Sequence, residues 1–228
     1  MRQSEVMRLL FSAIVLLSLV AGLSRLAAAT EPDIGHLLTE VERHYNRAQT
    51  LSVYFTETYS IAGRKHRPES GQLLLRKPGR MRWIYSEPAG KLFVSDGHNV
   101  YLYTADDNRV EQSKLKASED MRAPLAFLLG KLDMKKEFRG FEIKPAPNGT
   151  YLVAEAKNDR VPYGKVQMLI GQASEIKDLI VNGRDGSVLH FSFRDEAVNP
   201  AIADAEFHFV PPPGADVVQA VSAESGDN

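Results

Sequence analysis

The spacing of apolar residues changes once near the start of the chain, from a helical period to the period of a strand. Residues 32–48 carry apolar side chains three and four positions apart, with Pro32 near the beginning and Asp33 as a potential cap, which predicts an amphipathic helix. From Leu51 to Tyr59 apolar and polar residues alternate, which is typical of a half-buried strand. The pattern therefore predicts one helix followed by β-structure.

Short strands separated by turns occupy most of the remaining chain. Pro78-Gly79, Asp96-Gly97 and the segment 182–186 are turn signals between alternating runs. About eleven strands of even spacing predict a mainly β (α+β) fold, an antiparallel barrel or sandwich with one apolar and one wet face. After 51–59 the predicted strands are 71–77, 80–86, 91–95, 99–104, 138–144, 151–156, 165–170, 175–181, 187–194 and 205–210, with 109–112 a short strand at best.

A second helix and an unusually bulky apolar face leave two interpretations open. Pro124 precedes a run of leucines and a phenylalanine within 119–131, which predicts a short apolar helix. A barrel of this many strands is wide enough to hold internal space, and such a helix could cover it. An ordinary packed core with a helix across the sheet fits the pattern equally well. The large residues predicted on the apolar face are Phe55, Met81, Trp83, Tyr85, Phe93, Tyr101, Phe191 and Phe193.

The first residues have the composition of a secretory signal peptide. Arg2 and Arg8 are followed by an apolar run over 9–23, and Ala27-Ala28-Ala29 supplies small residues for cleavage after Ala29. The run is short for an uncleaved membrane anchor, and no second run long enough to span a membrane follows it. We therefore expect a signal peptide at 1–29, one domain at 30–218 and a disordered tail at 219–228, with the mature protein in the periplasm.

Composition removes several classes of function. The chain has 28 basic and 29 acidic residues, so it lacks the excess of positive charge that is typical of proteins that bind nucleic acids. It has no cysteine, which excludes disulfides and a lipid-modified N-terminal cysteine. The six histidines show no metal-binding spacing, and no nucleophile-elbow, P-loop or dinucleotide motif is present. The sequence therefore predicts no enzyme, no cofactor and no metal site.

Five segments carry a resemblance to a known family. The first is a basic residue and proline at Lys77-Pro78, followed by Trp83 and then Pro88. The others, in chain order, are 94–97 with 100–103, the apolar run 124–129, the turn 183–186 and the segment 207–217 with its Phe-x-Phe and triple proline. Each is weak alone, but their joint order and spacing resemble the LolA family of periplasmic carriers of outer-membrane lipoproteins.

The resemblance implies an unclosed antiparallel half-barrel with a helical lid over an apolar cavity for acyl chains. It also implies a monomer that binds acylated lipoproteins, receives them from an inner-membrane lipoprotein-releasing transporter complex and passes them to an outer-membrane acceptor lipoprotein. An ordinary core remains the alternative for the residues that match the cavity. The predicted cavity residues are Phe55, Met81, Trp83, Tyr85, Phe93, Leu125, Leu128, Leu129 and Phe191.

One departure from the family concerns the closure of the lid. The family has an arginine immediately before the proline of its first segment, and that arginine holds the lid closed. Here the position is Lys77, a point donor without the planar fork of arginine, and Arg76 lies on the opposite face of a regular strand. The resemblance therefore implies a weaker or differently built latch at Lys77.

Three rival functions remain at this stage. A carrier or sensor of another amphiphile, such as a glycolipid, would need the same apolar interior. An envelope-stress sensor built on a similar half-barrel would usually carry a second domain, for which the chain is too short. A periplasmic hydrolase would need a clustered catalytic set that the sequence does not contain.

Overall fold

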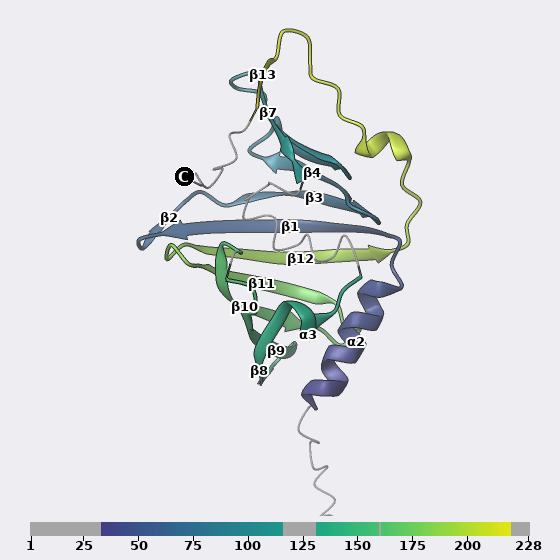
Figure 1. Cartoon of the computed structure of the whole chain (residues 1–228), viewed down its shortest axis with the longest axis vertical. Coiled ribbons are helices and arrows are strands. Elements are labelled where there is room, and N and C mark those ends of the chain that lie inside the picture. The colour runs from purple at the N-terminus through teal and green to yellow at the C-terminus, as the bar shows by residue number, and fades with distance from the viewer. Residues whose placement is uncertain (1–32, 116–130, 160, 220–228) are drawn as a thin grey trace, which may run out of the picture. The chain divides into compact units, whose positions relative to one another are not determined.

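The computed structural model describes residues 33–115, 131–159 and 161–219, and these contain one long sheet (Figure 1). The sheet has thirteen strands in the order β13-β7-β6-β5-β4-β3-β1-β12-β11-β10-β9-β8, with β2 paired to β1. The strands are β1 (Thr50–Ile61), β2 (Arg64–Lys65), β3 (Glu69–Arg76), β4 (Arg80–Glu87), β5 (Lys91–Asp96), β6 (Asn99–Thr104), β7 (Arg109–Lys114), β8 (Phe138–Ala146), β9 (Gly149–Ala156), β10 (Tyr163–Ile170), β11 (Ile176–Gly183), β12 (Val188–Val198) and β13 (Asp216–Gln219).

The sheet is antiparallel and unclosed. Every neighbouring pair in it is antiparallel except β13 and β7, which run parallel. Its two end strands, β13 and β8, are not paired with each other in the described residues. Buried side chains from strands along most of its length meet in a single hydrophobic cluster, which a flat sheet could not bring together. The predicted half-barrel is therefore confirmed, with thirteen strands where about eleven were expected.

Helix α2 (Ile34–Asn46) packs its apolar side against the end of the sheet where β1 begins and β12 ends (Figure 1). Leu38, Val41 and Tyr45 recur at helical spacing and are each at most 3% exposed within the common core. This confirms the helix predicted from the apolar period. No helix among the described residues is long and apolar enough to cross a membrane.

A short helix that the apolar period did not predict precedes β8. It is α3 (Met134–Glu137), and the Asp133 side chain caps it by accepting a hydrogen bond from the backbone N–H of Lys136. Met134 and the preceding Leu132 are at most 1% exposed and extend the core beneath α2. The apolar helix predicted within 119–131 lies outside the described residues, apart from its last position.

The strand predicted at 205–210 is wrong. Residues Asp204–Phe207 form a 3-10 helix, η3, and the last strand is β13, which pairs with β7. The alternation of Phe207 and Phe209 reflects two separate contacts rather than a ladder. The ring of Phe207 lies beneath the guanidinium groups of Arg76 and Arg80, and Phe209 packs against Tyr101 and Tyr103. Residues 200–215, called the C-terminal strap below, thus pack against the side of the sheet that carries Arg76, Arg80 and Tyr101. Gln219, which was expected in the tail, belongs to β13.

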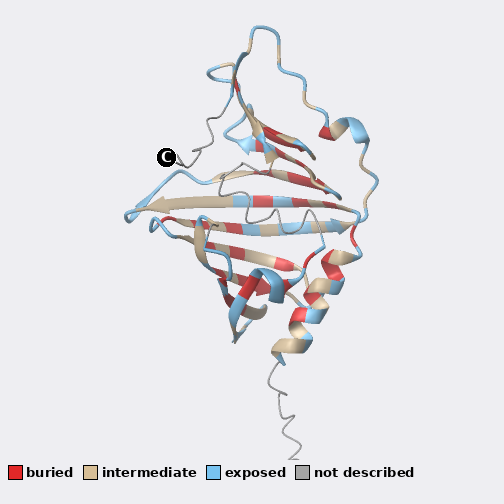
Figure 2. Cartoon of the chain, viewed as in Figure 1, coloured by how far each residue is buried: buried red, intermediate tan, exposed pale blue. Residues whose placement is uncertain are grey.

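Buried residues alternate with less buried ones along several strands of the sheet (Figure 2). On β4, Met81, Trp83 and Tyr85 are buried, whereas Ile84 between them is 37% exposed. The face that carries the buried cluster is called the inner face below, and the opposite one the outer face. Period-two alternation fixes this division, because successive side chains of a strand point to opposite sides. The prediction of Tyr101 on the apolar face is wrong, because Tyr101 pairs with Val94, and Val94 with Arg82, on the outer face.

A close backbone approach between β3 and β4 requires a glycine at position 71. The pairing register shifts between Ser70 and Gly71. A Cβ at position 71 would overlap the backbone carbonyl oxygen of Ile84, which cannot move as a flexible side chain would. Gly71 therefore lets β3 approach the strand that carries Trp83.

Candidate functional site

The inner face gathers six of the predicted cavity residues. They come from four strands, and none is more than 4% exposed: Phe55 on β1, Met81, Trp83 and Tyr85 on β4, Phe93 on β5 and Phe191 on β12. Leu125, Leu128 and Leu129 lie outside the described residues. The sequence placed the first six on one face because each strand alternates regularly at that point.

Trp83 is at the centre of this group. Its ring lies 4.7 Å from that of Phe55 and 5.5 Å from that of Phe191, measured between centroids. Its indole N–H points to the sulfur of Met81 at 3.1 Å, and Phe93 is its register partner on β5. Tyr85 closes the group on the other side, with its ring 5.2 Å from Phe55 in an edge-to-face arrangement. Aromatic rings and a thioether provide a large, adaptable apolar surface.

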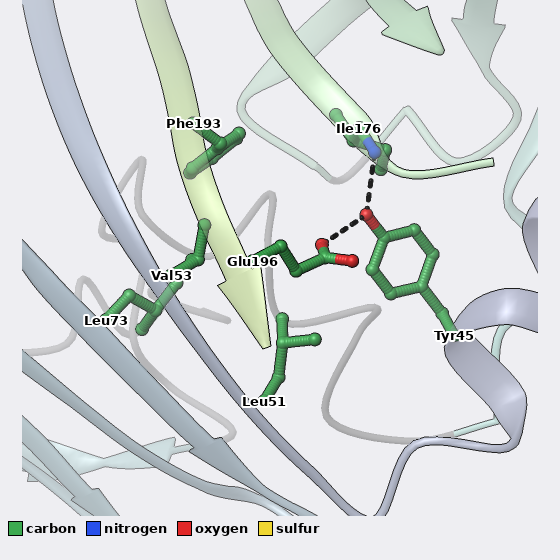
Figure 3. Close-up of a pocket in the computed structure, with 7 residues that line it drawn as sticks. All are labelled: Tyr45, Leu51, Val53, Leu73, Ile176, Phe193 and Glu196. Atoms are coloured by element: carbon green, nitrogen blue, oxygen red, sulfur yellow. Dashed lines mark hydrogen bonds between the residues drawn. The ribbon is translucent and has the colours of Figure 1, made fainter. Parts of the chain in front are cut away.

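Two small crevices border the inner face among the residues that the structure describes. One crevice beneath α2 has a volume of about 10 Å³, which is room for about one water molecule. It is lined by Tyr45, Leu51, Val53, Leu73, Ile176, Phe193 and Glu196 (Figure 3). A second crevice of about 10 Å³ shares Tyr45 and Leu51 and reaches Lys77. Neither crevice is large enough for an alkyl chain.

Two links fasten the last turn of α2 to β12 through one carboxylate. Glu196 bonds to the ring Nε2 of His44 at 2.6 Å and accepts a hydrogen bond from the Tyr45 hydroxyl at 3.0 Å. The same hydroxyl accepts a bond from the backbone N–H of Ile176 at 2.8 Å (Figure 3). Burial, together with the charge of Glu196, raises the pKa of Tyr45 well above its ordinary value.

A β-bulge places Glu196 in this position. Between Ser52 and Tyr54 on β1 the register shifts, so that Asp195 and Glu196 together oppose one residue of β1. Asp195 adopts a left-handed backbone conformation at φ 55°. Regular alternation from Phe191 and Phe193 would turn Glu196 outward, and the extra residue re-aims it toward α2. Glu196 is for this reason absent from the predicted site residues, because Asp195-Glu196 at the end of a strand carries no local sequence signal for a bulge.

Lys77 lies on the other side of the same helix end. Its ammonium group donates a hydrogen bond to the backbone carbonyl oxygen of Tyr45 at 2.8 Å. Burial lowers the pKa of Lys77 from its ordinary value. Arg76 extends to the outer face instead, where it pairs with Asp204 and donates to the carbonyl oxygen of Ile202 in the C-terminal strap. Lys77 thus holds a helix carbonyl, and Arg76 holds the strap.

The inner face becomes polar at the end away from α2. Glu57 is directly opposite Glu69 in the pairing of β1 with β3. Lys91 on β5 pairs with Glu69, and its ammonium group lies 4.4 Å above the ring of Tyr85. The apolar surface around Trp83 is therefore bounded by a charged rim at one end and by the fastened helix at the other. Among the described residues, no group of three or more histidine, aspartate or glutamate side chains is placed to hold a metal ion.

The fold and this face define a half-barrel protein with an apolar interior that a helix closes at one end. The chain belongs to the LolA family: the family model described as outer membrane lipoprotein carrier protein LolA matches residues 46–210. That range includes β1 to β12, and β13 lies beyond it.

Curated relatives align over most of the chain. An outer-membrane lipoprotein carrier protein from Chromobacterium violaceum is 26% identical over 212 residues, covering 93% of this chain and 98% of the relative. A protein of the same name from Pseudomonas aeruginosa is 27% identical over 201 residues, covering 88% and 96%. An uncharacterized conserved protein from Thermus thermophilus has a similar fold, with a TM-score of 0.51 at 13% identity over 82% of this chain and 98% of the other.

Proposed function

We propose that this protein is a periplasmic carrier that binds the acyl chains of lipoproteins released from the inner membrane and delivers them to an outer-membrane acceptor. The observation that carries the proposal is the inner face, where six large apolar side chains converge on Trp83. Relatives named as lipoprotein carriers align across nearly the whole chain, which supports the same conclusion. The role is binding rather than catalysis.

Energetics explain why a carrier should be closed at rest. Each buried methylene contributes about 0.8 kcal/mol, so three chains with about forty methylenes in all would gross roughly 30 kcal/mol. Noncovalent affinities do not exceed about 20 kcal/mol, and a carrier must also release its cargo. Opening a closed interior offsets part of the gain from burial.

The latch of this carrier is Lys77 in the proposal. Its bond to the Tyr45 carbonyl joins the end of β3 to the last turn of α2, so a movement of α2 away from the inner face must break it. A single ammonium donor provides one such bond, whereas an arginine fork could hold two acceptors. Leu125, Leu128 and Leu129 would complete the lid.

Localisation and partners follow from the same reasoning. The predicted signal peptide at 1–29 directs export, and the mature domain at 30–218 works as a monomer between two membranes. It receives cargo from an inner-membrane transporter complex and passes it to an acceptor lipoprotein in the outer membrane. The charged rim of Glu69 and Lys91 faces the polar part of the cargo.

The test compares two peptides and two surfaces. We would titrate the protein from Thr30 onward with a triacylated lipopeptide and with the same peptide lacking acyl chains. Trp83→Ala and the milder Trp83→Leu should each weaken binding of the acylated peptide at least tenfold. The wild type and both variants should fail to bind the peptide that lacks acyl chains. Ile84→Ala, on the outer face of the same strand, is the matched control and should bind normally.

Three outcomes would oppose the proposal. A folded protein that binds neither peptide would exclude lipoprotein carriage, and equal binding of both peptides would exclude recognition of the acyl chains. Binding of a diacyl glycolipid in place of the lipopeptide would replace the proposed cargo with another amphiphile. Circular dichroism establishes that each variant is folded before it is compared.

A further inference from the structure

A hollow on the surface and a crevice in the core lie on the two sides of Glu196. The hollow has a volume of about 430 Å³ and is open to solvent. It shares Ile176, Phe193 and Glu196 with the crevice of about 10 Å³ that also includes Leu51, Val53 and Leu73 (Figure 3). The hollow and the crevice are therefore neighbours, separated by Glu196 and by the apolar side chains of Ile176 and Phe193.

Three polar contacts join α2 to the sheet between the hollow and the crevice. Glu196 bonds to His44 at 2.6 Å and to the Tyr45 hydroxyl at 3.0 Å, and that hydroxyl bonds to the backbone of Ile176 at 2.8 Å. The side chains of His44 and Glu196 are 7% and 13% exposed, so they lie between the hollow and the crevice and are largely shielded from solvent. All three bonds run between α2 and the ends of β11 or β12, so one small movement of α2 breaks them together.

Breaking these contacts leaves polar groups that water in the hollow can hydrate in part. The hollow reaches Glu196 and His44 from solvent, so a displaced carboxylate and imidazole would be hydrated. Apolar packing in the same place would expose hydrocarbon on opening instead. The bulge that turns Glu196 inward holds Asp195 at φ 55°, a conformation disfavoured for a residue other than glycine. Strained backbone is often found at sites that change conformation, which favours a contact between Glu196 and α2 that opens and closes.

We propose that Glu196, His44 and Tyr45 form a gate at a side entrance, through which the end of a single alkyl chain passes from the hollow to the inner face. The inference rests on the proposed function, because the entrance leads to the face assigned to acyl chains. Ile176 and Phe193 form the apolar wall of the open route. The head group stays in the hollow, where two basic residues, Lys177 and Arg194, and two acidic ones, Glu175 and Asp195, favour a neutral polar group.

Trp83 reports the arrival of a chain on the inner face. It is the only tryptophan in the sequence, is fully buried and packs against Phe55 and Phe191. A bromine at the far end of an alkyl chain quenches tryptophan fluorescence on close approach. We would mix the protein from Thr30 onward with ω-bromododecanol in a stopped-flow instrument and measure the rate of quenching.

Variants of the gate should change this rate in both directions. Tyr45→Phe removes the hydroxyl, and Glu196→Ala removes the carboxylate; each should raise the rate about tenfold, equivalent to about 1.4 kcal/mol. Ala173→Phe fills the exposed rim of the hollow and should lower the rate at least threefold. Tyr54→Phe removes a hydroxyl from an exposed outer-face tyrosine and is the matched control, with a rate unchanged within twofold.

The outcomes separate this inference from the proposed function. Equal quenching rates in the wild type and in all gate variants would place the entrance elsewhere and overturn the gate. Absence of quenching by ω-bromododecanol in a protein that binds the triacylated lipopeptide would overturn the gate and leave the carrier intact. A protein that binds neither ligand would overturn both. Ala173→Phe keeps the test decisive if either gate variant fails to fold.

Discussion

Replacing Lys77 by methionine separates a latch from an ordinary structural contact. The substitution removes the ammonium group that donates to the Tyr45 carbonyl oxygen at 2.8 Å. Methionine keeps most of the apolar stem, so packing around it changes little. The carbonyl belongs to the last turn of α2, where a cation also interacts favourably with the helix dipole.

The magnitude follows from the environment of this bond. A hydrogen bond to a charged group contributes about 1.5–3 kcal/mol when it is well buried. Lys77 is only half-buried, so solvent screening weakens the bond. We therefore expect its removal to lower the free energy of unfolding by about 1–1.5 kcal/mol, at or just below the lower end of that range. Because 1.4 kcal/mol corresponds to a factor of about ten in an equilibrium constant, the closed form should lose up to about tenfold in population relative to an open form.

Two measurements on the same variant test whether Lys77 acts on closure. Urea denaturation should show a loss of about 1–1.5 kcal/mol in the free energy of unfolding. Titration with the triacylated lipopeptide should show tighter binding by up to about tenfold, because cargo no longer has to break the bond. Lys165→Met, at an exposed lysine of β10, is the matched control and should leave both values unchanged.

A loss of stability without any gain in affinity would refute this reasoning. It would mean that Lys77 holds α2 equally in the empty and the loaded protein and is not a latch. Lys77→Arg gives the opposite check. An arginine that reaches the same carbonyl should restore stability and weaken the binding of cargo relative to the methionine variant.

Three further substitutions test the core, the buried tyrosine and the close strand approach. Trp83→Ala should lower the free energy of unfolding by about 3–5 kcal/mol in urea denaturation, and a loss below about 1 kcal/mol would contradict the dense packing described here. The pKa of Tyr45 is raised in the folded protein, so its contribution to stability is complete below pH 10.0, the ordinary pKa of tyrosine, and is lost as the pH rises above that value. The free energy of unfolding of Tyr45→Phe should therefore fall less than that of the wild type between about pH 8 and pH 11. An equal fall in both proteins would refute the assignment. Gly71→Ala should destabilise the protein by about 1–3 kcal/mol, because the new Cβ would overlap the Ile84 carbonyl oxygen. Gly164→Ala is the control, since a Cβ there would only touch the end of the Arg184 side chain. Equal melting curves for the two variants would contradict the close approach of β3 and β4.

Regular alternation is the part of the structure that the sequence predicts well. The buried residues of β4 and their neighbours Phe55, Phe93 and Phe191 were all identified from period-two patterns. The same rule failed at Phe207 and Phe209, because alternation there arises from two independent contacts with the outer face. Alternation gives the side on which a residue lies only while the chain remains a strand.

The contacts that close the inner face could not be predicted in the same way. Glu196 meets His44 across 152 positions of sequence, and the meeting depends on a bulge that no local pattern announces. Lys77 was identified only because the family resemblance singled out its position. The amount of free space on the inner face is likewise a property of packing rather than of pattern, since the same residues can line an open cavity or fill a closed one.

The pairing of β1 with β12 at the middle of the sheet also determines when the chain can fold. This pairing joins Leu51 to Val198 and Ser60 to Val188, so the central strands come from nearly opposite ends of the domain. A partly synthesised chain that lacks β12 has an unpaired edge where the finished protein has its centre. Such distant pairing slows folding, because a long loop must close before any contact compensates for the lost entropy. The order of the strands therefore delays completion of the half-barrel until nearly the whole chain is available.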